Sequence, residues 1–277
     1  MILVYHHNDL DGICAAAIII KRYGAENVKC VPVQYEKNTW NPEDVKNASS
    51  VWVVDFTFSD MEALAELAGD KLVWCDHHKS AQEQHKELWG SDIKGLRNME
   101  YAGCGLTWTY CYPDTETPSS VLYIEDRDLW RFIFPNTKPF CAGAAIDTPF
   151  HEEWDQLLKQ GVPEIMIEYI SRGNASLKSQ ERRVKYLFEL GTDAEIHGHK
   201  ARIVNSTSDV SELGEYIYTN GYEIAVMWHC EGDKIKCDLR SNVIDCAEIA
   251  QQYGGGGHKG AAGFRLDNSE GFPMELF

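Results

Sequence analysis

Short, mostly apolar runs alternate with helical patterns along the first half of the chain. Strand-like runs occupy residues 2–5, 28–33, 51–55 and 71–78, and each is shorter than an ordinary helix. Runs of this kind are typical of strands that are buried on both faces of a parallel sheet. The alternation therefore predicts an α/β fold whose N-terminal domain has a Rossmann-like parallel sheet with helices on its faces.

Helical patterns fill the segments between and after these runs. Gly24 is placed to end the first helix, because glycine commonly terminates helices. The predicted helices of this half cover residues 13–23, 61–68, 81–88, 102–112 and 119–130.

The pattern changes after about residue 149. Residues 151–190 show little strand character, and residues 175–190 predict a helix with a charged face. A second α/β pattern follows, and its last helix, near 246–253, has Asp245 as a candidate cap. Strands at 201–204, 223–228 and 234–239 and a helix near 210–219 precede it. We therefore expect a larger α/β domain over 1–148, a helical connector over 149–195 and a smaller α/β domain over 196–277.

Three of the apolar runs end in acidic residues or histidines. In an open parallel sheet, ligands collect beyond the carboxyl ends of the strands, so these groups are expected to converge. A solvated surface loop is the alternative for any single group, but repetition at several strand ends favours a site. The candidates are His6, His7, Asp9 and Asp11 after the first run, Asp55 after the third, and Asp76, His77 and His78 after the fourth, joined by the acidic cluster that contains Asp126 and Asp128.

Carboxylates that converge repel one another unless cations neutralise them. Sets rich in oxygen with one or two imidazoles suit Mn²⁺ or Mg²⁺ better than Zn²⁺. Two such ions about 3.5–4 Å apart can share one carboxylate and act together on a phosphate ester. The pattern therefore indicates a site for two divalent metal ions, with Mn²⁺ preferred and Mg²⁺ as the alternative.

A run of glycines near the C-terminus forms a second candidate site. Residues 254–257 are all glycine, and backbone N–H groups of such a run can close on an anion. His258 and Lys259 add donors, and Arg240 and Ser241 end another apolar run that can reach the same anion. A flexible linker is the alternative, but the run leads directly from a capped helix into an apolar strand pattern.

Charge and cysteine content narrow the function and the compartment. The formal charge of −17 argues against a broad grip on long duplex nucleic acid, but it is compatible with a short phosphate-bearing substrate. The nine cysteines are scattered without a C-x-x-C, which indicates reduced thiols in a cytoplasmic protein. We see neither a signal peptide nor an apolar stretch long enough to span a membrane. A homodimer is compatible with the sequence.

The motifs together resemble those of a known family. H-N-D-L-D-G, V-V-D-F, C-D-H-H-K and E-D-R-D-L-W, in this order, resemble the DHH phosphoesterases, and L-R-S followed by G-G-G-G-H-K-G-A-A-G-F resembles their DHH-associated C-terminal domain. The resemblance spans nearly the whole chain. Its size and H-N-D-L-D-G motif look most like the members that degrade very short RNA, called nano-RNases or oligoribonuclease-like enzymes.

The resemblance implies a role for each matched residue. Asp55 would bridge the two metal ions, Asp76 would orient the site, and His78 would contact the scissile phosphate. One ion would be held by His7, Asp9 and Asp55, and the other by Asp11, Asp55, His77 and Asp126. Substrate would be held across a cleft by the second domain, through Arg240, Ser241, Gly256, Gly257 and His258. His6 competes with His7, and Asp128 with Asp126.

The implied activity is metal-dependent hydrolysis of short oligonucleotides to mononucleotides. Enzymes with other phosphate substrates are alternatives: a cyclic or linear dinucleotide phosphodiesterase, a 3′-phosphoadenosine 5′-phosphate phosphatase, or a single-strand DNA exonuclease. A non-catalytic nucleotide-sensing module is the alternative from another class. The filled set of acidic and histidine positions disfavours it.

Overall fold

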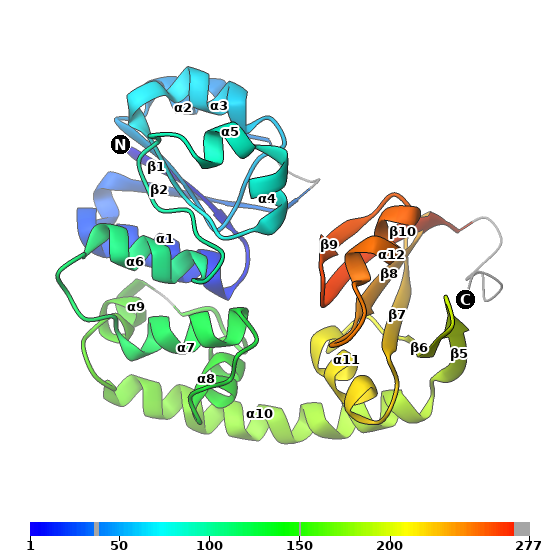
Figure 1. Ribbon diagram of the computed structural model, residues 1–277. Coiled ribbons are helices and arrows are strands. Elements are labelled where there is room, and N and C mark those ends of the chain that lie inside the picture. The colour runs from blue at the N-terminus through cyan, green and yellow to red at the C-terminus, as the bar shows by residue number, and fades with distance from the viewer. Residues whose placement is uncertain (36–38, 150, 269–277) are drawn as a thin grey trace. The chain divides into compact units, whose positions relative to one another are not determined.

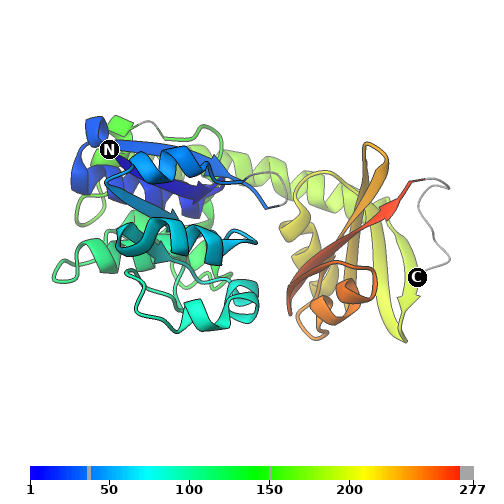
Figure 2. The same ribbon diagram turned by 90° about the horizontal axis from the view of Figure 1, so that it is seen from above.

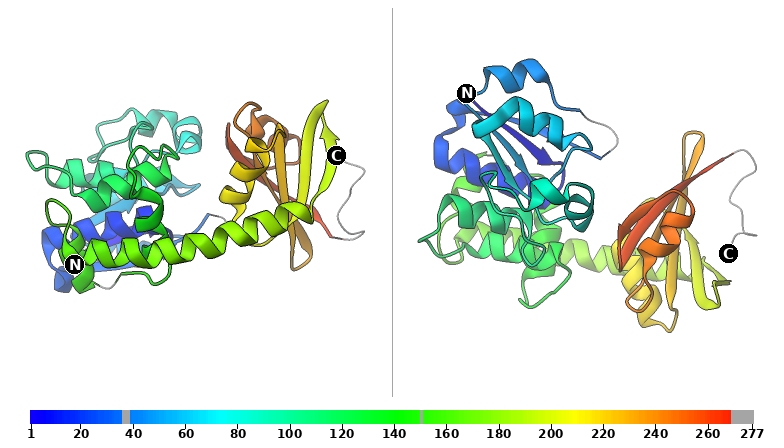
Figure 3. Two further views of the ribbon diagram at one scale, coloured as in Figure 1. Left: turned by 90° about the horizontal axis from the view of Figure 1, so that it is seen from below. Right: turned by 45° about the horizontal axis from the view of Figure 1, so that its top comes forward.

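The protein consists of two compact units joined within one long helix. The computed structural model describes residues 1–35, 39–149 and 151–268, and the units are Met1–Leu177 and Lys178–Phe277. The boundary falls inside α10 (Glu164–Glu189), which Figure 3 shows as one uninterrupted helix. The expected connector, 149–195, is therefore divided between the two units instead of forming a separate body.

The first unit is built on a four-stranded parallel sheet, as the apolar runs predict. Its order is β2-β1-β3-β4, so the central strand β1 pairs with both β2 and β3. All four strands run in the same direction, and their carboxyl ends therefore meet at one edge. The strands are β1 (Ile2–His7), β2 (Val28–Val33), β3 (Ser50–Val54) and β4 (Leu72–Cys75).

Helices cover both faces of this sheet (Figures 1 and 2). Side chains alternate along β1, so Val4 belongs to the core on one face, and Leu3 and Tyr5 to the core on the other. The helices of this unit are α1 (Leu10–Tyr23), α2 (Pro42–Asn47), α3 (Met61–Ala68), α4 (Lys79–Gln84), α5 (Lys86–Trp89), α6 (Gly103–Cys111), α7 (Ser119–Asp128), α8 (Thr137–Ala144) and α9 (His151–Leu157), with short 3₁₀ turns at Ala25–Asn27 and Gly69–Lys71.

Local sequence explains where α1 begins and ends. The side chain of Asp9 caps the helix by accepting a hydrogen bond from Gly12 N at 3.0 Å, and Gly24 follows the last turn. The single helix predicted over 81–88 is instead two short helices, α4 and α5, which are separated at His85.

The second unit has a six-stranded mixed sheet of order β5-β6-β7-β8-β10-β9. Helix α11 (Val210–Thr219) packs on β7 and β8, and α12 (Cys246–Gln252) packs on β9 and β10. The carboxylate of Asp245 caps α12 as predicted, accepting from Ala247 N at 3.0 Å. The strands are β5 (Thr192–Ile196), β6 (His199–Asn205), β7 (Ile224–Glu231), β8 (Lys234–Arg240), β9 (Gly256–His258) and β10 (Ala261–Asp267).

Two expectations from the sequence, on the cysteines and on membrane spans, can be compared with the described residues. All nine cysteines lie in the described part of the chain and are free thiols. Over residues 1–35, 39–149 and 151–268, no helix is both long and apolar enough to cross a membrane.

Candidate functional site

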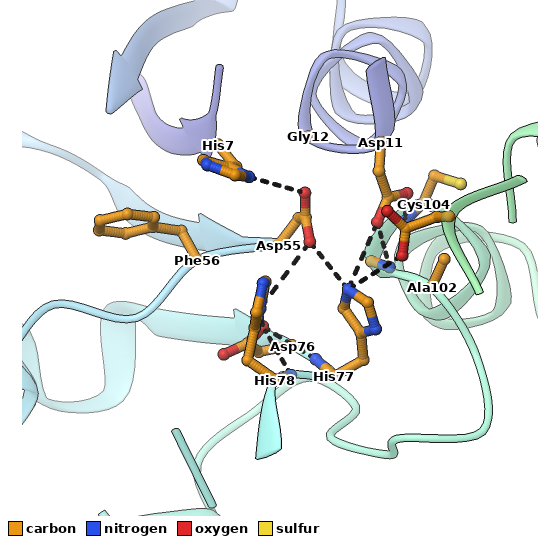
Figure 4. A network of polar contacts seen from close by, with 12 residues as sticks. His7, Asp11, Gly12, Asp55, Phe56, Asp76, His77, His78, Ala102 and Cys104 are labelled. Atoms are coloured by element: carbon orange, nitrogen blue, oxygen red, sulfur yellow. Dashed lines mark hydrogen bonds and ion pairs between the residues drawn. The ribbon is translucent and has the colours of Figure 1, made fainter. Parts of the chain in front are cut away.

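The carboxyl edge of the parallel sheet gathers the histidines and acidic residues that follow its strands. β1 ends at His7, Asp55 follows β3, and Asp76, His77 and His78 follow β4. Helix α1 adds Asp11 from its first turn (Figure 4). The convergence predicted from the strand ends is therefore present in the fold.

Asp55 lies at the centre of this group (Figure 4). Its Oδ1 is 3.1 Å from His77 Nε2 and 4.0 Å from His78 Nδ1, whereas its Oδ2 is 3.7 Å from His7 Nδ1. His7 Nδ1 is in turn 2.7 Å from Asp9 Oδ2. The two oxygens of Asp55 thus point to two different groups of side chains, which is the placement expected of a bridging carboxylate.

His77 connects Asp55 to a further pair of carboxylates. Its Nε2 lies 3.5 Å from Asp128 Oδ2 and 3.7 Å from Asp11 Oδ2. The ligand atoms fall into three sets, each compact enough for one metal ion: Asp55, His77 and His78; His7, Asp9 and Asp55; and Asp11, His77 and Asp128. Because Asp55 and His77 belong to two sets each, neighbouring cations would share them.

The start of α6 holds two of these carboxylates in place. Gly103 N and Cys104 N donate to Asp11 Oδ2 and Oδ1 at 2.7 and 2.8 Å. A Cβ at Gly103 would lie only 2.5 Å from Asp55 Cβ, so the close approach of α6 to Asp55 requires glycine. Asp55 itself has φ +53°, a left-handed conformation that costs energy in most residues and is common at functional sites.

Burial makes the ionised carboxylates of this cluster unfavourable. It is the largest cause that raises the pKa of Asp55 to about 8, and the neighbouring Asp9 charge adds to it. Burial also raises the pKa values of Asp11 and Asp128, reinforced in Asp11 by the charges of Asp55 and Asp128. A bound cation would remove this conflict, because its charge favours the ionised form of every carboxylate near it.

The cluster also contains a buried polar atom without a hydrogen bond. Among the described residues, the buried Asp55 Oδ2 has no hydrogen-bond partner, and the nearest histidine nitrogen, His7 Nδ1 at 3.7 Å, is paired with Asp9 Oδ2 at 2.7 Å. Unsatisfied buried groups are costly and call for an explanation such as an ion. Carboxylate oxygens and imidazole nitrogens suit Mn²⁺ or Mg²⁺, so the residues present fit a divalent metal.

Asp76 holds two histidines of the site in place through its side chain. It is fully buried, and its Oδ1 accepts from His77 N at 2.8 Å and lies 2.7 Å from His78 Nδ1. Its Oδ2 accepts from the Thr57 hydroxyl. Burial alone would lower the pKa of His78, but the Asp76 carboxylate raises it to about 9. Asp76 therefore holds the orientation of His78 and favours its charged form.

The geometry favours one residue of each pair that the sequence left open, His7 over His6 and Asp128 over Asp126. His7 lies in the cluster, whereas the buried His6 contacts the carbonyl oxygen of His7 through its Nδ1. The choice of Asp126 needs correction. Its carboxylate accepts from Ile133 N at 2.8 Å and Phe134 N at 3.2 Å, and from the Thr137 hydroxyl. Asp126 thus organises the loop after α7. The position beside His77 that was expected for Asp126 is occupied by Asp128, whose Oδ2 lies 3.5 Å from His77 Nε2.

The residues expected to bind substrate in the second unit have structural contacts of their own. Ser241 is buried, and its hydroxyl donates to Glu223 O and accepts from Val243 N and Ile244 N. This network gives Ser241 a structural role in the turn after β8, and its contact with substrate stays a prediction. Arg240 Nη1 donates to Leu239 O at 2.8 Å.

The glycine run is not the open loop that the sequence suggests. Gly256–His258 forms β9, an edge strand paired with β10. A Cβ at Gly257, where φ is +143°, would lie 2.6 Å from Ala261 O. Glycine there permits close pairing of the strands, while the exposed His258 side chain remains at the sheet edge.

Two residues near the cluster were missed by the sequence reasoning. Thr57 donates to Asp76, and the ring of Tyr35 lies 5.6 Å from the His7 ring and 5.7 Å from the His78 ring, centroid to centroid. Tyr35 comes just after β2, so its position after a strand end was the available signal.

Comparison with known proteins places the chain in a family. Residues 1–126 match the DHH family N-terminal domain and residues 198–274 match the DHHA1 domain. The chain is 24% identical over 321 residues to oligoribonuclease NrnB of Bacillus subtilis, covering 99% of this chain and 75% of the relative. It is 28% identical over 312 residues to an uncharacterized protein of Acanthamoeba polyphaga mimivirus, covering 99% and 69%.

A solved structure shares the fold. The structure of RecJ in complex with Mn²⁺ from Thermus thermophilus superposes with a TM-score of 0.57 at 16% identity, covering 97% of this chain and 50% of that one. The two matched domains lie in the order that the motifs H-N-D-L-D-G, C-D-H-H-K and G-G-G-G-H indicate. The chain belongs to the DHH family of phosphoesterases, and it is a phosphoester hydrolase with a DHH domain followed by a DHHA1 domain.

Proposed function

We propose that this hydrolase is a metal-dependent phosphodiesterase that releases mononucleotides from short oligonucleotides. The observation that carries the proposal is the position of Asp55, whose two oxygens face two separate groups of imidazoles and carboxylates. A shared carboxylate between two cations is the arrangement used for in-line displacement at phosphorus. The similarity to a relative named oligoribonuclease supports oligonucleotides as the substrate class.

Two divalent ions fit the residues of the site. His7, Asp9 and Asp55 would hold one, and Asp11, Asp55, His77 and Asp128 the other. When bound, such ions activate water and neutralise charge on phosphoryl oxygens. RecJ of Thermus thermophilus, which shares the fold, binds Mn²⁺, and this favours Mn²⁺ for the first assays, with Mg²⁺ as the second choice.

His78 is the protein group best placed to act on the scissile phosphate. Its Nδ1 lies 2.7 Å from Asp76 Oδ1, so the fully buried Asp76 sets the orientation of the ring. Without metal ions, the Asp76 carboxylate raises the pKa of the His78 ring to about 9, against the lowering effect of burial. A charged imidazolium donates a strong hydrogen bond to a phosphoryl oxygen.

Substrate length is the first test of the proposal. The rate per substrate end should fall from a dinucleotide to a 24-mer RNA, because a chain with formal charge −17 offers little cationic surface for additional phosphates. Product release is measured from labelled RNAs of both lengths with Mn²⁺, with and without chelator. Raising the salt concentration should weaken binding of the 24-mer only modestly. Faster cleavage of the 24-mer with a steep salt dependence would indicate a long-strand exonuclease instead.

A second test addresses the DHHA1 unit. We expect His258→Ala to raise KM for the dinucleotide and leave Mn²⁺ affinity unchanged, because His258 is exposed on β9 and belongs to none of the metal-binding sets. Loss of a charge-assisted hydrogen bond to phosphate costs about 1.5–3 kcal/mol. His197→Asn is the matched control, since it removes an exposed imidazole from a turn of the same unit. Loss of bound Mn²⁺ in the His258 variant would contradict this role.

A further inference from the structure

A column of aromatic rings runs from the core of the first unit to the edge of the candidate site. Tyr5 and Phe58 are 5.3 Å apart between ring centroids, Phe58 and Phe56 are 5.0 Å apart, and Phe56 and Tyr35 are 4.4 Å apart. Tyr5, Phe56 and Phe58 are buried at 2–3% exposure, whereas Tyr35 is 39% exposed. Tyr35 is therefore the exposed end of an otherwise buried aromatic column.

One face of the Tyr35 ring is already covered. The Phe56 ring lies against it in a tilted arrangement, with an interplanar angle of 32°. The exposed area of Tyr35 therefore lies in the parts of the residue that the rings of Phe56, His7 and His78 do not cover. Because the column below it is packed in the core, the ring is held in place before any ligand binds, which lowers the entropy cost of stacking on it.

Tyr35 also lies beside His7, a proposed metal ligand, and His78, which is proposed to contact the scissile phosphate. Its ring meets the rings of His7 and His78 at interplanar angles of 63° and 71°. Figure 4 shows Phe56, on which Tyr35 packs, beside His7 and His78. An uncharged aromatic ring at this place adds nothing to phosphate binding. It suits a flat ring such as a nucleobase, which the sugar connects to the phosphate.

We propose that Tyr35 is a specificity-determining residue on which a nucleobase of the substrate stacks. The inference rests on the proposed function and adds what the charged cluster cannot supply. Metal ions and protonated imidazoles bind any phosphodiester, whatever groups are esterified to it. An aromatic face distinguishes nucleotides from other phosphodiesters, and it accepts every base because every base has a π-face.

The test combines variants of Tyr35 with a substrate that lacks a base. We compare a dinucleotide with two abasic analogues, in each of which hydrogen replaces one of the two bases. Tyr35→Ala should raise KM for the dinucleotide about 30-fold, the middle of the range for loss of one stacked base. It should leave KM unchanged for the analogue that lacks the stacked base. Tyr35→Phe keeps the ring and should stay within about twofold of wild type.

Tyr23→Ala is the matched control. Tyr23 is also 39% exposed and also packs against a buried aromatic ring, that of Trp52 at 5.9 Å, but it ends α1, whose first turn carries Asp11. Its loss should leave KM for the dinucleotide unchanged. Mn²⁺ affinity, measured by calorimetry, should be the same in all variants, because tyrosine is not part of any metal-binding set.

Each contrary result has a distinct meaning. An equal loss on the dinucleotide and on both abasic analogues, or weaker Mn²⁺ binding, would make Tyr35 a structural support and overturn the proposal. A loss in Tyr35→Phe as large as in Tyr35→Ala would assign the effect to the hydroxyl and overturn stacking as well. If wild type does not hydrolyse the dinucleotide with Mn²⁺, the proposed function is wrong. Calorimetric binding of the same dinucleotide and analogues to wild type and Tyr35→Ala then tests stacking independently of turnover.

Discussion

Asp55→Asn is expected to lower kcat on a dinucleotide by about 10³-fold at saturating Mn²⁺, since removal of one group that stabilises transition-state charge costs this much in other enzymes. The substitution keeps the size of the side chain but removes the charge that two cations would share. Both oxygens of Asp55 face the cluster, one toward His7 and one toward His77, so its loss would affect both groups of candidate ligands. The measurement is steady-state turnover across a Mn²⁺ titration.

A second readout separates loss of metal from loss of fold. Mn²⁺ should raise the Tm of the wild type after chelator treatment, because a ligand that binds only the native state stabilises it. It should not raise the Tm of Asp55→Asn. Without metal the variant should be at least as stable as wild type, because burial raises the pKa of Asp55 to about 8 and ionisation of the folded form is unfavourable.

The control for charge alone is Asp70→Asn, an exposed acidic residue of the same unit. Its turnover and its response to Mn²⁺ should match those of the wild type. Near-wild-type turnover of Asp55→Asn at high Mn²⁺ would show that no ion depends on a shared carboxylate. The two-ion proposal would then be wrong, while membership of the phosphoesterase family would stand.

The parallel sheet could be predicted because β1, β3 and β4 are mostly buried on both faces. Val51, Trp52, Val53 and Val54 show this as an unbroken apolar run. β5 reads T-D-A-E-I and was missed, because it is an edge strand paired only with β6 and its side chains are mostly exposed. β9 was missed for another reason. A three-residue strand of glycine and histidine is defined by its pairing with β10, and no apolar pattern marks it.

The candidate site could be predicted as far as parallel strands place their ends together. His7, Asp55 and His77 follow strands and were found, since the topology brings any residue at that edge into range. Choosing among residues of one helix turn requires knowing which face of α7 meets α6. A clue exists in the helical spacing: Glu125 accepts from Ala102 N, beside the N–H groups that hold Asp11. Asp128 shares the face of Glu125 three residues on, whereas Asp126 points elsewhere.

The second prediction compares Asp126→Asn with Asp128→Asn. The first variant should lose stability, and the second should lose activity. Asp126→Asn should lower the Tm of the first unit by about 3–10 °C. The reason is that an amide offers one acceptor oxygen where the carboxylate has two, and the NH₂ group then faces donors: Ile133 N, or Phe134 N and the Thr137 hydroxyl. Thermal unfolding of the metal-free protein measures this loss.

Asp128→Asn should lower activity and leave the stability of the metal-free protein unchanged. Its kcat should fall about 10²-fold or more, as expected when a group that holds a catalytic cation is removed, and its affinity for Mn²⁺ should fall with it. Its metal-free Tm should not fall, because burial already raises the pKa of the Asp128 carboxyl and a neutral amide relieves repulsion with Asp11. Turnover and calorimetric Mn²⁺ binding of both variants decide the assignment. If Asp126→Asn instead loses Mn²⁺ at unchanged Tm while Asp128→Asn keeps full activity, the ligand is Asp126 and the correction drawn from the geometry of α7 is wrong.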